Sequence, residues 1–136
     1  MKMKSNVNFF RRLGAITYDL FIVFSLILFL DVIAVIVFIG KEDTSGILFY
    51  LVTLPAIYYY YVFSWVIRGQ TVGMMAWKFK IQTTDNKKLS YSIASKRLVL
   101  SWFSFAFFGL GYLYQFIDKE NDALHDKISK TKLLMK

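Results

Sequence analysis

The chain has no cysteine, so disulfide bonds, thiolate nucleophiles and cysteine-ligated zinc are excluded, and the redox compartment stays undetermined. It also lacks linkers rich in proline, serine or glycine and has no low-complexity block. We therefore treat residues 1–136 as a single domain. With one histidine, no HExxH, no glycine-rich nucleotide loop and no serine set near a histidine, the sequence predicts neither an enzyme nor a bound cofactor.

Apolar residues are abundant instead. Hydrophobic residues make up 57% of the chain and aromatic residues 19%, far more than in a soluble domain of this size. The lipid bilayer is therefore the expected surroundings. The net charge of +8 does not predict nucleic-acid binding, because the basic residues flank apolar segments and do not gather in one patch.

Three apolar runs are long enough to cross a bilayer, since about 20 apolar residues suffice for one crossing. They occupy residues 13–39, 46–67 and 98–117. The first follows a basic N-terminal arm, but it is longer than a signal peptide and has no small-x-small cleavage site, so we expect a retained signal anchor. The third carries Gly109 and Gly111 near its middle and either spans or breaks and re-enters.

The second run contains Pro55, which removes one backbone hydrogen bond and predicts a kink. The Tyr58–Tyr61 cluster and Trp65 near its end are typical of the headgroup layer. We expect these aromatic side chains to mark one edge of the membrane.

The distribution of lysine and arginine distinguishes the two topologies. If the third run spans, the seventeen basic residues divide into eleven inside and six outside. If it re-enters, sixteen lie inside and only Lys41 lies outside. The second division is cleaner, so we predict an all-α membrane protein with two transmembrane helices and a broken or re-entrant third segment. Both termini, the loop 68–97 and the tail 118–136 are then cytoplasmic.

The loop 68–97 is expected to hold a short interfacial helix or strand. Thr71 is a plausible N-cap for a helix with one apolar face. That face comprises Val72, Met75, Ala76 and Phe79. From Lys78 the polar and apolar residues alternate, so a short strand is an equal alternative there. Ser90 or Ser92 is the expected cap of a helix leading into the third run.

Charged residues within the first apolar run are the main functional candidates. Arg12 and Asp19 are seven residues apart and project from nearly the same helix face, with the small Ala15 between them, which predicts an Arg12–Asp19 pair. Asp31 lies on a face rotated by roughly 120° and is a secondary candidate. A carboxylate at the bilayer centre costs roughly 2.5–3.5 kcal/mol, and such residues usually face a partner, a cavity or a pathway.

The tail contains the only histidine, His125, beside Asp126 and one turn from Asp122. This spacing has the look of a metal-ligand set, but a solvated, capped helix is favoured, so no metal site is predicted. Asp126 alternatively docks onto Arg97 or Arg12.

The order of these motifs resembles the RDD family of bacterial membrane proteins, which is named for one arginine and two aspartates. The matching residues are Arg12, Ala15 and Asp19, then the stretch 69–73, Arg97, residues 124–127 and Thr131. The resemblance implies that the arginine is Arg12 and that the aspartates are Asp19 and Asp126, with Arg97 and His125 as secondary candidates. One departure is that Met74 and Met75 stand where family members often have a basic residue.

The resemblance implies a multi-pass protein of the bacterial cell membrane with its N-terminus in the cytoplasm. Transport of unidentified ligands and ion or proton exchange have been suggested for the family. One hypothesis is therefore a transport or ion-exchange component that uses Asp19 beside Arg12, with a second copy or a partner membrane protein completing the pathway. The alternative is a structural or accessory membrane protein in which the charges hold the fold together.

Overall fold

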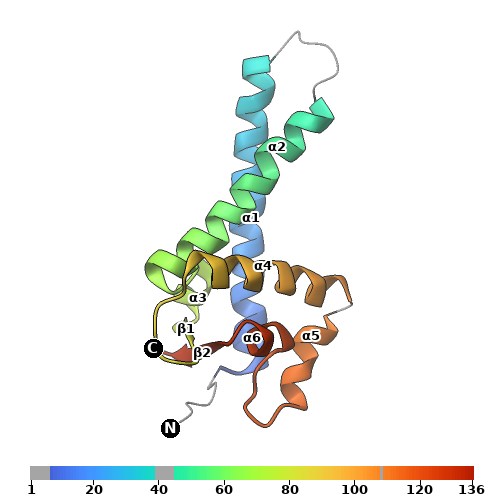
Figure 1. The fold of residues 1–136 in the computed structure, drawn as a ribbon. Coiled ribbons are helices and arrows are strands. Elements are labelled where there is room, and N and C mark those ends of the chain that lie inside the picture. The colour runs from blue at the N-terminus through green and yellow to red at the C-terminus, as the bar shows by residue number, and fades with distance from the viewer. Residues whose placement is uncertain (1–6, 39–44, 108) are drawn as a thin grey trace.

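A computed structural model describes residues 7–38, 45–107 and 109–136 (Figure 1). Six α-helices, a π-helix, a 3-10 helix and two strands make up the described part of the chain. In chain order they are α1 (Phe9–Phe38), α2 (Ser45–Tyr58), η1 (Tyr59–Arg68), α3 (Val72–Ala76), β1 (Phe79–Thr83), α4 (Tyr91–Ala106), α5 (Leu110–Leu113), η2 (Tyr114–Phe116), α6 (Leu124–Ile128) and β2 (Thr131–Met135).

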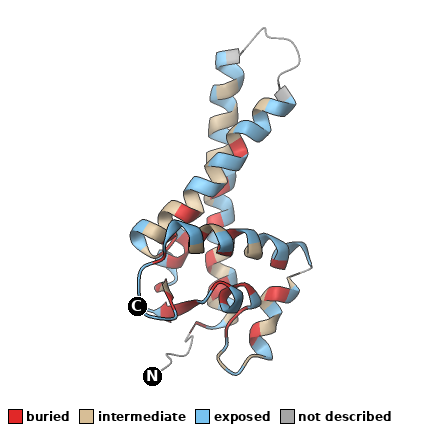
Figure 2. Cartoon of the chain, in the orientation of Figure 1, coloured by how far each residue is buried: buried red, intermediate tan, exposed pale blue. Residues whose placement is uncertain are grey.

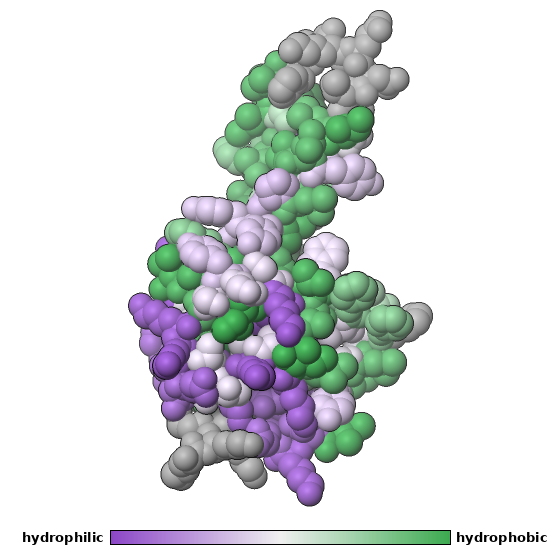
Figure 3. Space-filling model, viewed as in Figure 1, coloured by the Kyte–Doolittle hydropathy of each residue, from purple (hydrophilic) through white to green (hydrophobic). Residues whose placement is uncertain are grey.

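Two of these helical stretches can cross a bilayer, as the sequence predicts. They are Phe9–Val37 and Gly46–Arg68, and they form a hairpin that rises away from the other elements (Figure 1). The far half of the hairpin exposes large apolar side chains such as Phe21, Phe29 and Val35, which suits contact with lipid tails (Figure 3). The expected end of the first run at Ile39 and most of the turn that follows it lie outside the described residues.

The second crossing changes its hydrogen-bonding pattern along its length. The α-helix passes through Pro55, which lacks the N–H that would bond one turn back, and the π-helix begins at Tyr59. It ends at Gly69, whose φ of +69° is a left-handed conformation that glycine adopts without strain. The turn at Gly69 directs the chain back toward the start of α1 (Figure 1).

The loop between the second and third runs contains both the helix and the strand that were weighed for it. Thr71 caps α3 by accepting a hydrogen bond from the Met74 amide, as predicted. The helix is shorter than predicted, because Phe79 belongs to β1 and is buried there. Val72 and Met75 are exposed, so the expected apolar face of this helix does not pack against the protein.

The C-terminal tail forms a strand that the sequence analysis did not predict. β1 and β2 pair antiparallel, with Ile81 opposite Leu133 and Thr83 opposite Thr131. The tail therefore lies at the same end of the hairpin as the loop that follows Gly69 (Figure 1). This pairing favours a broken or re-entrant third run over a crossing that would leave the tail at the other end.

The third apolar run is broken, as predicted. Ser90 caps α4 by accepting from the Ile93 amide, and α4 then crosses α1 near the base of the hairpin (Figure 1). The chain bends by 104° between α4 and the α5–η2 pair. Gly109, at φ +74°, lies at this bend. Phe103, Phe107 and Leu110 around the bend are exposed.

The buried core lies at the base of the hairpin, where α1, η1, α3, α4 and the β1–β2 sheet meet (Figure 2). Its central side chains include Ala15, Val62, Met74, Ile81 and Leu133. The protein therefore consists of a lipid-exposed hairpin standing on a small packed layer, and the charged residues of interest lie in that layer.

Candidate functional site

Asp126 is the centre of a buried charge cluster. Its side chain is 0% exposed, and it lies on α6 between arginines from two other helices. Nη1 of Arg12 on α1 is 2.6 Å from one carboxylate oxygen, and Nη2 of Arg97 on α4 is 2.5 Å from the other. This confirms the expectation that Asp126 docks onto the arginines. One carboxylate therefore joins three elements that are far apart in sequence.

Each arginine makes a further contact that fixes its orientation. Nη2 of Arg12 donates to the carbonyl oxygen of Asn121 at 2.9 Å, and Nε of Arg97 donates to the hydroxyl of Thr131 at 3.3 Å. The guanidinium carbon of Arg97 also lies 4.6 Å from the centre of the Trp65 ring, a cation–π arrangement. We call Arg12, Arg97 and Asp126 the clamp.

The clamp holds Asp126 in its ionised form. Burial alone raises the pKa of a carboxyl group, but the charges of Arg97 and Arg12 outweigh burial and hold the pKa of Asp126 well below its ordinary value. Two arginines against one carboxylate leave one net positive charge in the clamp.

His125 and Asp122 are also buried, so the expectation of a solvated tail helix is wrong. Burial, reinforced by the charges of Arg97 and Arg12, lowers the pKa of His125 to about 4. Burial and the nearby charge of Asp126 raise the pKa of Asp122 to about 6, although Lys132 lies 3.9 Å away. At neutral pH the histidine is therefore uncharged, and its ring packs edge-on against Tyr112.

Asp19 forms a second, separate polar cluster. Its Oδ1 accepts hydrogen bonds from the hydroxyl of Tyr60 at 2.7 Å and the amide of Gly73 at 2.8 Å, and its Oδ2 accepts one from the hydroxyl of Thr71. The Thr71 hydroxyl thus caps α3 with a lone pair while donating its proton to Asp19. Asp19 anchors α3 and η1 to the side of α1.

The predicted Arg12–Asp19 pair does not form. Arg12 is directed toward Asp126 and Asp19 toward Tyr60, Thr71 and Gly73, so the two residues on one stripe of α1 serve different neighbours. Helical spacing correctly placed both on one face, but it could not show which other elements cover each end of that face.

Asp31 takes part in neither cluster. It lies three turns beyond Asp19 on α1 and is half-buried. Within the described part of the chain it makes no hydrogen bond or ion pair. The described residues also contain no group of three or more His, Cys, Asp or Glu side chains that could hold a metal ion.

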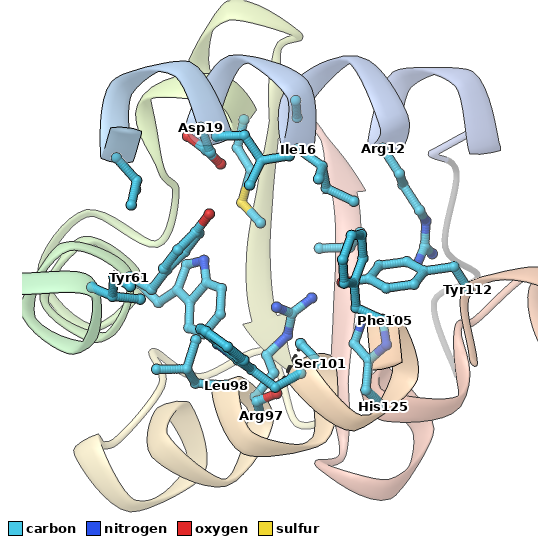
Figure 4. A pocket seen from close by; sticks show the side chains of 18 of the residues that line it. Arg12, Ile16, Asp19, Tyr61, Arg97, Leu98, Ser101, Phe105, Tyr112 and His125 are labelled. Atoms are coloured by element: carbon cyan, nitrogen blue, oxygen red, sulfur yellow. Dashed lines mark hydrogen bonds between the residues drawn. The ribbon is translucent and has the colours of Figure 1, made fainter. Parts of the chain in front are cut away.

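A cavity of about 370 Å³ lies between α1, η1 and α4 (Figure 4). Along α1 its wall runs from Arg12 to Ile27, and Ile57, Leu98 and Phe105 add apolar surface. The polar residues that line it are Arg12, Asp19, Tyr61, Trp65, Arg97, Ser101, Trp102, Tyr112 and His125. In Figure 4 the guanidinium of Arg97 points into the middle of this space, while Asp19 lies near Tyr61 at one end.

Several residues of these clusters were not anticipated in these roles. Tyr60 and Trp65 were assigned to the headgroup layer, whereas Tyr60 donates to Asp19 and Trp65 is buried beneath Arg97. Gly73 was noted only as part of a motif. A β-carbon there would lie 2.1 Å from the carbonyl oxygen of Ala15, so glycine is needed for α3 to approach α1. In the sequence, a glycine two residues after the capping Thr71 was the feature that could have indicated this close approach of two helices.

Comparisons with known proteins identify the family. No curated protein and no solved structure matches the chain significantly. The model of the RDD family matches residues 7–130, which include both aspartates and both arginines described above. The chain therefore belongs to the RDD family of membrane proteins.

Proposed function

We propose that this protein is an accessory integral membrane protein. The arginines and aspartates described above stabilise the fold and do not form an ion pathway. The observation that carries the proposal is the complete use of Asp126, which is fully buried and bonded through both oxygens to Arg12 and Arg97. A carboxylate held in this way is not available to bind a mobile ion without breaking two ion pairs.

The surroundings of Asp19 support the same proposal. A cation site needs several oxygen atoms that turn lone pairs toward one point. The groups around Asp19 instead donate hydrogen bonds to it, from two hydroxyls and one amide. These contacts are typical of a structural carboxylate that fixes one helix against another.

The proposal includes a location and an orientation. We place the chain in the bacterial cell membrane as a multi-pass protein with its N-terminus and tail in the cytoplasm. The described lysines and arginines belong to the start of α1, the end of η1 and the chain from Lys78 onward, all at one end of the hairpin (Figure 1). Cytoplasmic segments carry an excess of such residues.

An accessory role also requires a partner in the membrane. The far half of the hairpin exposes mostly apolar side chains, so a second copy or another membrane protein can pack there. We propose a homo-oligomer or a complex with another membrane protein.

The test is a comparison of flux and stability in the full-length protein reconstituted into vesicles. We expect the wild type to carry no more proton or sodium flux than protein-free vesicles, and Asp19→Asn to lower thermal stability. Asp31→Asn is the matched control, because Asp31 makes no polar contact in the described structure, and it should leave stability unchanged. A wild-type flux that Asp19→Asn abolishes while the fold is retained would contradict the proposal.

One observation favours transport as a second candidate. Among the described residues that line the cavity, Asp19 is the one that carries a carboxylate. If the wild type carries flux, Asp19 is the residue at which an ion or proton would meet that cavity, and a second copy would have to complete the pathway.

A further inference from the structure

The cavity beside the clamp has the two-part chemistry of an amphiphile site. Its α1 wall extends from Arg12 to Ile27, which is roughly 22 Å at about 1.5 Å per residue. The Arg12 end meets the buried charges, and the Ile27 end lies beside the exposed apolar side chains of Phe24 and Leu28. Its volume of about 370 Å³ falls within the range of about 300–1,000 Å³ that is usual for small-molecule sites.

The polar end offers hydrogen-bond donors that no described residue accepts. Arg97 is only 4% exposed, and its Nε and Nη2 bond Thr131 and Asp126, but Nη1 makes no hydrogen bond to any described residue. The indole N–H of buried Trp65 likewise has no acceptor among the described residues. Both groups are donors only, so both require an acceptor, and both residues line the cavity.

His125 adds another buried polar atom to the cavity wall. Its Nδ1 has no hydrogen bond within the described structure, and the ring lines the same cavity. Two buried atoms without a described partner, Nε1 of Trp65 and Nδ1 of His125, are unusual around one space, because buried polar groups are nearly always paired. The donors of Arg97 and Trp65 require a ligand rich in oxygen atoms, whereas Nδ1 of the neutral His125, whose Nε2 lies 3.5 Å from Asp126, is an acceptor and requires a hydroxyl or amine donor.

The charge of the site selects the kind of oxygen ligand. The clamp carries one net positive charge, since Arg12 and Arg97 share the single carboxylate of Asp126. Asp19, the acid on the cavity wall, lies about two turns along α1 from Arg12 and beside Tyr61, and its oxygens are already bonded to three donors (Figure 4). An anionic group is therefore favoured at Arg97.

We propose that the cavity binds one anionic phospholipid. Its phosphate accepts hydrogen bonds from Nη1 of Arg97 and the indole N–H of Trp65, and one acyl chain follows the α1 wall toward Ile27. The ligand thereby uses the unpaired donors and fills apolar space that faces the bilayer. This inference is independent of whether the protein carries ions or serves a partner.

The test is native mass spectrometry of the full-length protein from non-ionic detergent, with phosphatidylglycerol and phosphatidylcholine of the same acyl chains. We expect one bound phosphatidylglycerol and roughly a tenfold preference over phosphatidylcholine, because both lipids carry the phosphate but the choline cation is repelled by the net positive charge of the clamp. Equal retention of the two lipids would overturn the proposal. Glycerol phosphate at equal concentration should not displace the lipid, and displacement would instead indicate a site for soluble phosphate.

Two variants that fill the cavity from opposite walls make the test specific. Ser101→Trp on α4 and Ile16→Trp on α1 should each reduce retention of phosphatidylglycerol at least tenfold. Val99→Trp is the matched control, because Val99 is 55% exposed on α4 and does not line the cavity. Thermal unfolding shows which variants are folded. Retention unchanged in a folded cavity-filling variant, or lost equally in the control, would refute the site.

Discussion

Replacing Asp126 by asparagine tests the clamp most directly. The substitution keeps the shape of the side chain but removes its charge, and it places an amide NH2 against one of two guanidinium groups that now lie 2.6 Å and 2.5 Å from carboxylate oxygens. Removing one partner of a buried ion pair typically costs about 3–5 kcal/mol. We expect a loss of about 4 kcal/mol, which is a large part of the roughly 5–15 kcal/mol that holds a domain folded.

The measurement is the free energy of unfolding in detergent micelles, followed by circular dichroism during titration with a denaturing detergent. Asp31→Asn makes the same chemical change on α1 and should stay within about 0.5 kcal/mol of the wild type. Because the pKa of Asp126 is depressed in the folded protein, its contribution is present above about pH 4 and is lost as the pH falls through the folded value. The wild type and Asp126→Asn should therefore converge in acid. A loss below about 1 kcal/mol at pH 7 would refute the clamp as a determinant of the fold.

Three further predictions concern the neighbouring contacts. Gly73→Ala places a β-carbon 2.1 Å from the Ala15 carbonyl oxygen and should destabilise by about 1–3 kcal/mol in the same titration, whereas Gly46→Ala, with open space around it, should not. Tyr60→Phe removes the 2.7 Å bond to Asp19 and should cost about 1.5–3 kcal/mol, against little change for exposed Tyr59→Phe. Between about pH 6 and 4, burial opposes protonation of His125 (pKa about 4) and favours that of Asp122 (pKa about 6), so the two contributions to stability cancel in part. His125→Gln should therefore become more stable as the pH falls through this window and Asp122→Asn less stable, and equal slopes for the two variants would contradict these assignments.

Features set by local chemistry could be predicted from the sequence. The two crossings follow from the length of their apolar runs, and the caps Thr71 and Ser90 follow from side chains that bond an amide three residues on. The break in the third run accompanies Gly109, which takes a left-handed conformation. In each case the cause and the effect lie within a few residues of one another.

Features set by contacts between distant segments could not be predicted in the same way. Helical spacing offered Asp19 as the partner of Arg12, but the chain brings Asp126 to Arg12 across a sequence separation of 114 residues. The burial of His125 and the strand β2 depend on the same long-range assembly, because the tail alone reads as a polar segment. The unused donors of Arg97 and Trp65 become visible only when all their neighbours are placed.

The late position of Asp126 in the chain has a consequence for the order of assembly during synthesis. The hairpin can enter the membrane as soon as residues 9–68 are made, but Arg12 and Arg97 receive their shared carboxylate only when residue 126 has left the ribosome. Until then two guanidinium groups have no buried counter-charge, so the layer beneath the hairpin stays open and exposed to proteases. A nascent chain stopped before Asp126 would therefore be anchored in the bilayer yet recognisable to quality control as unfinished.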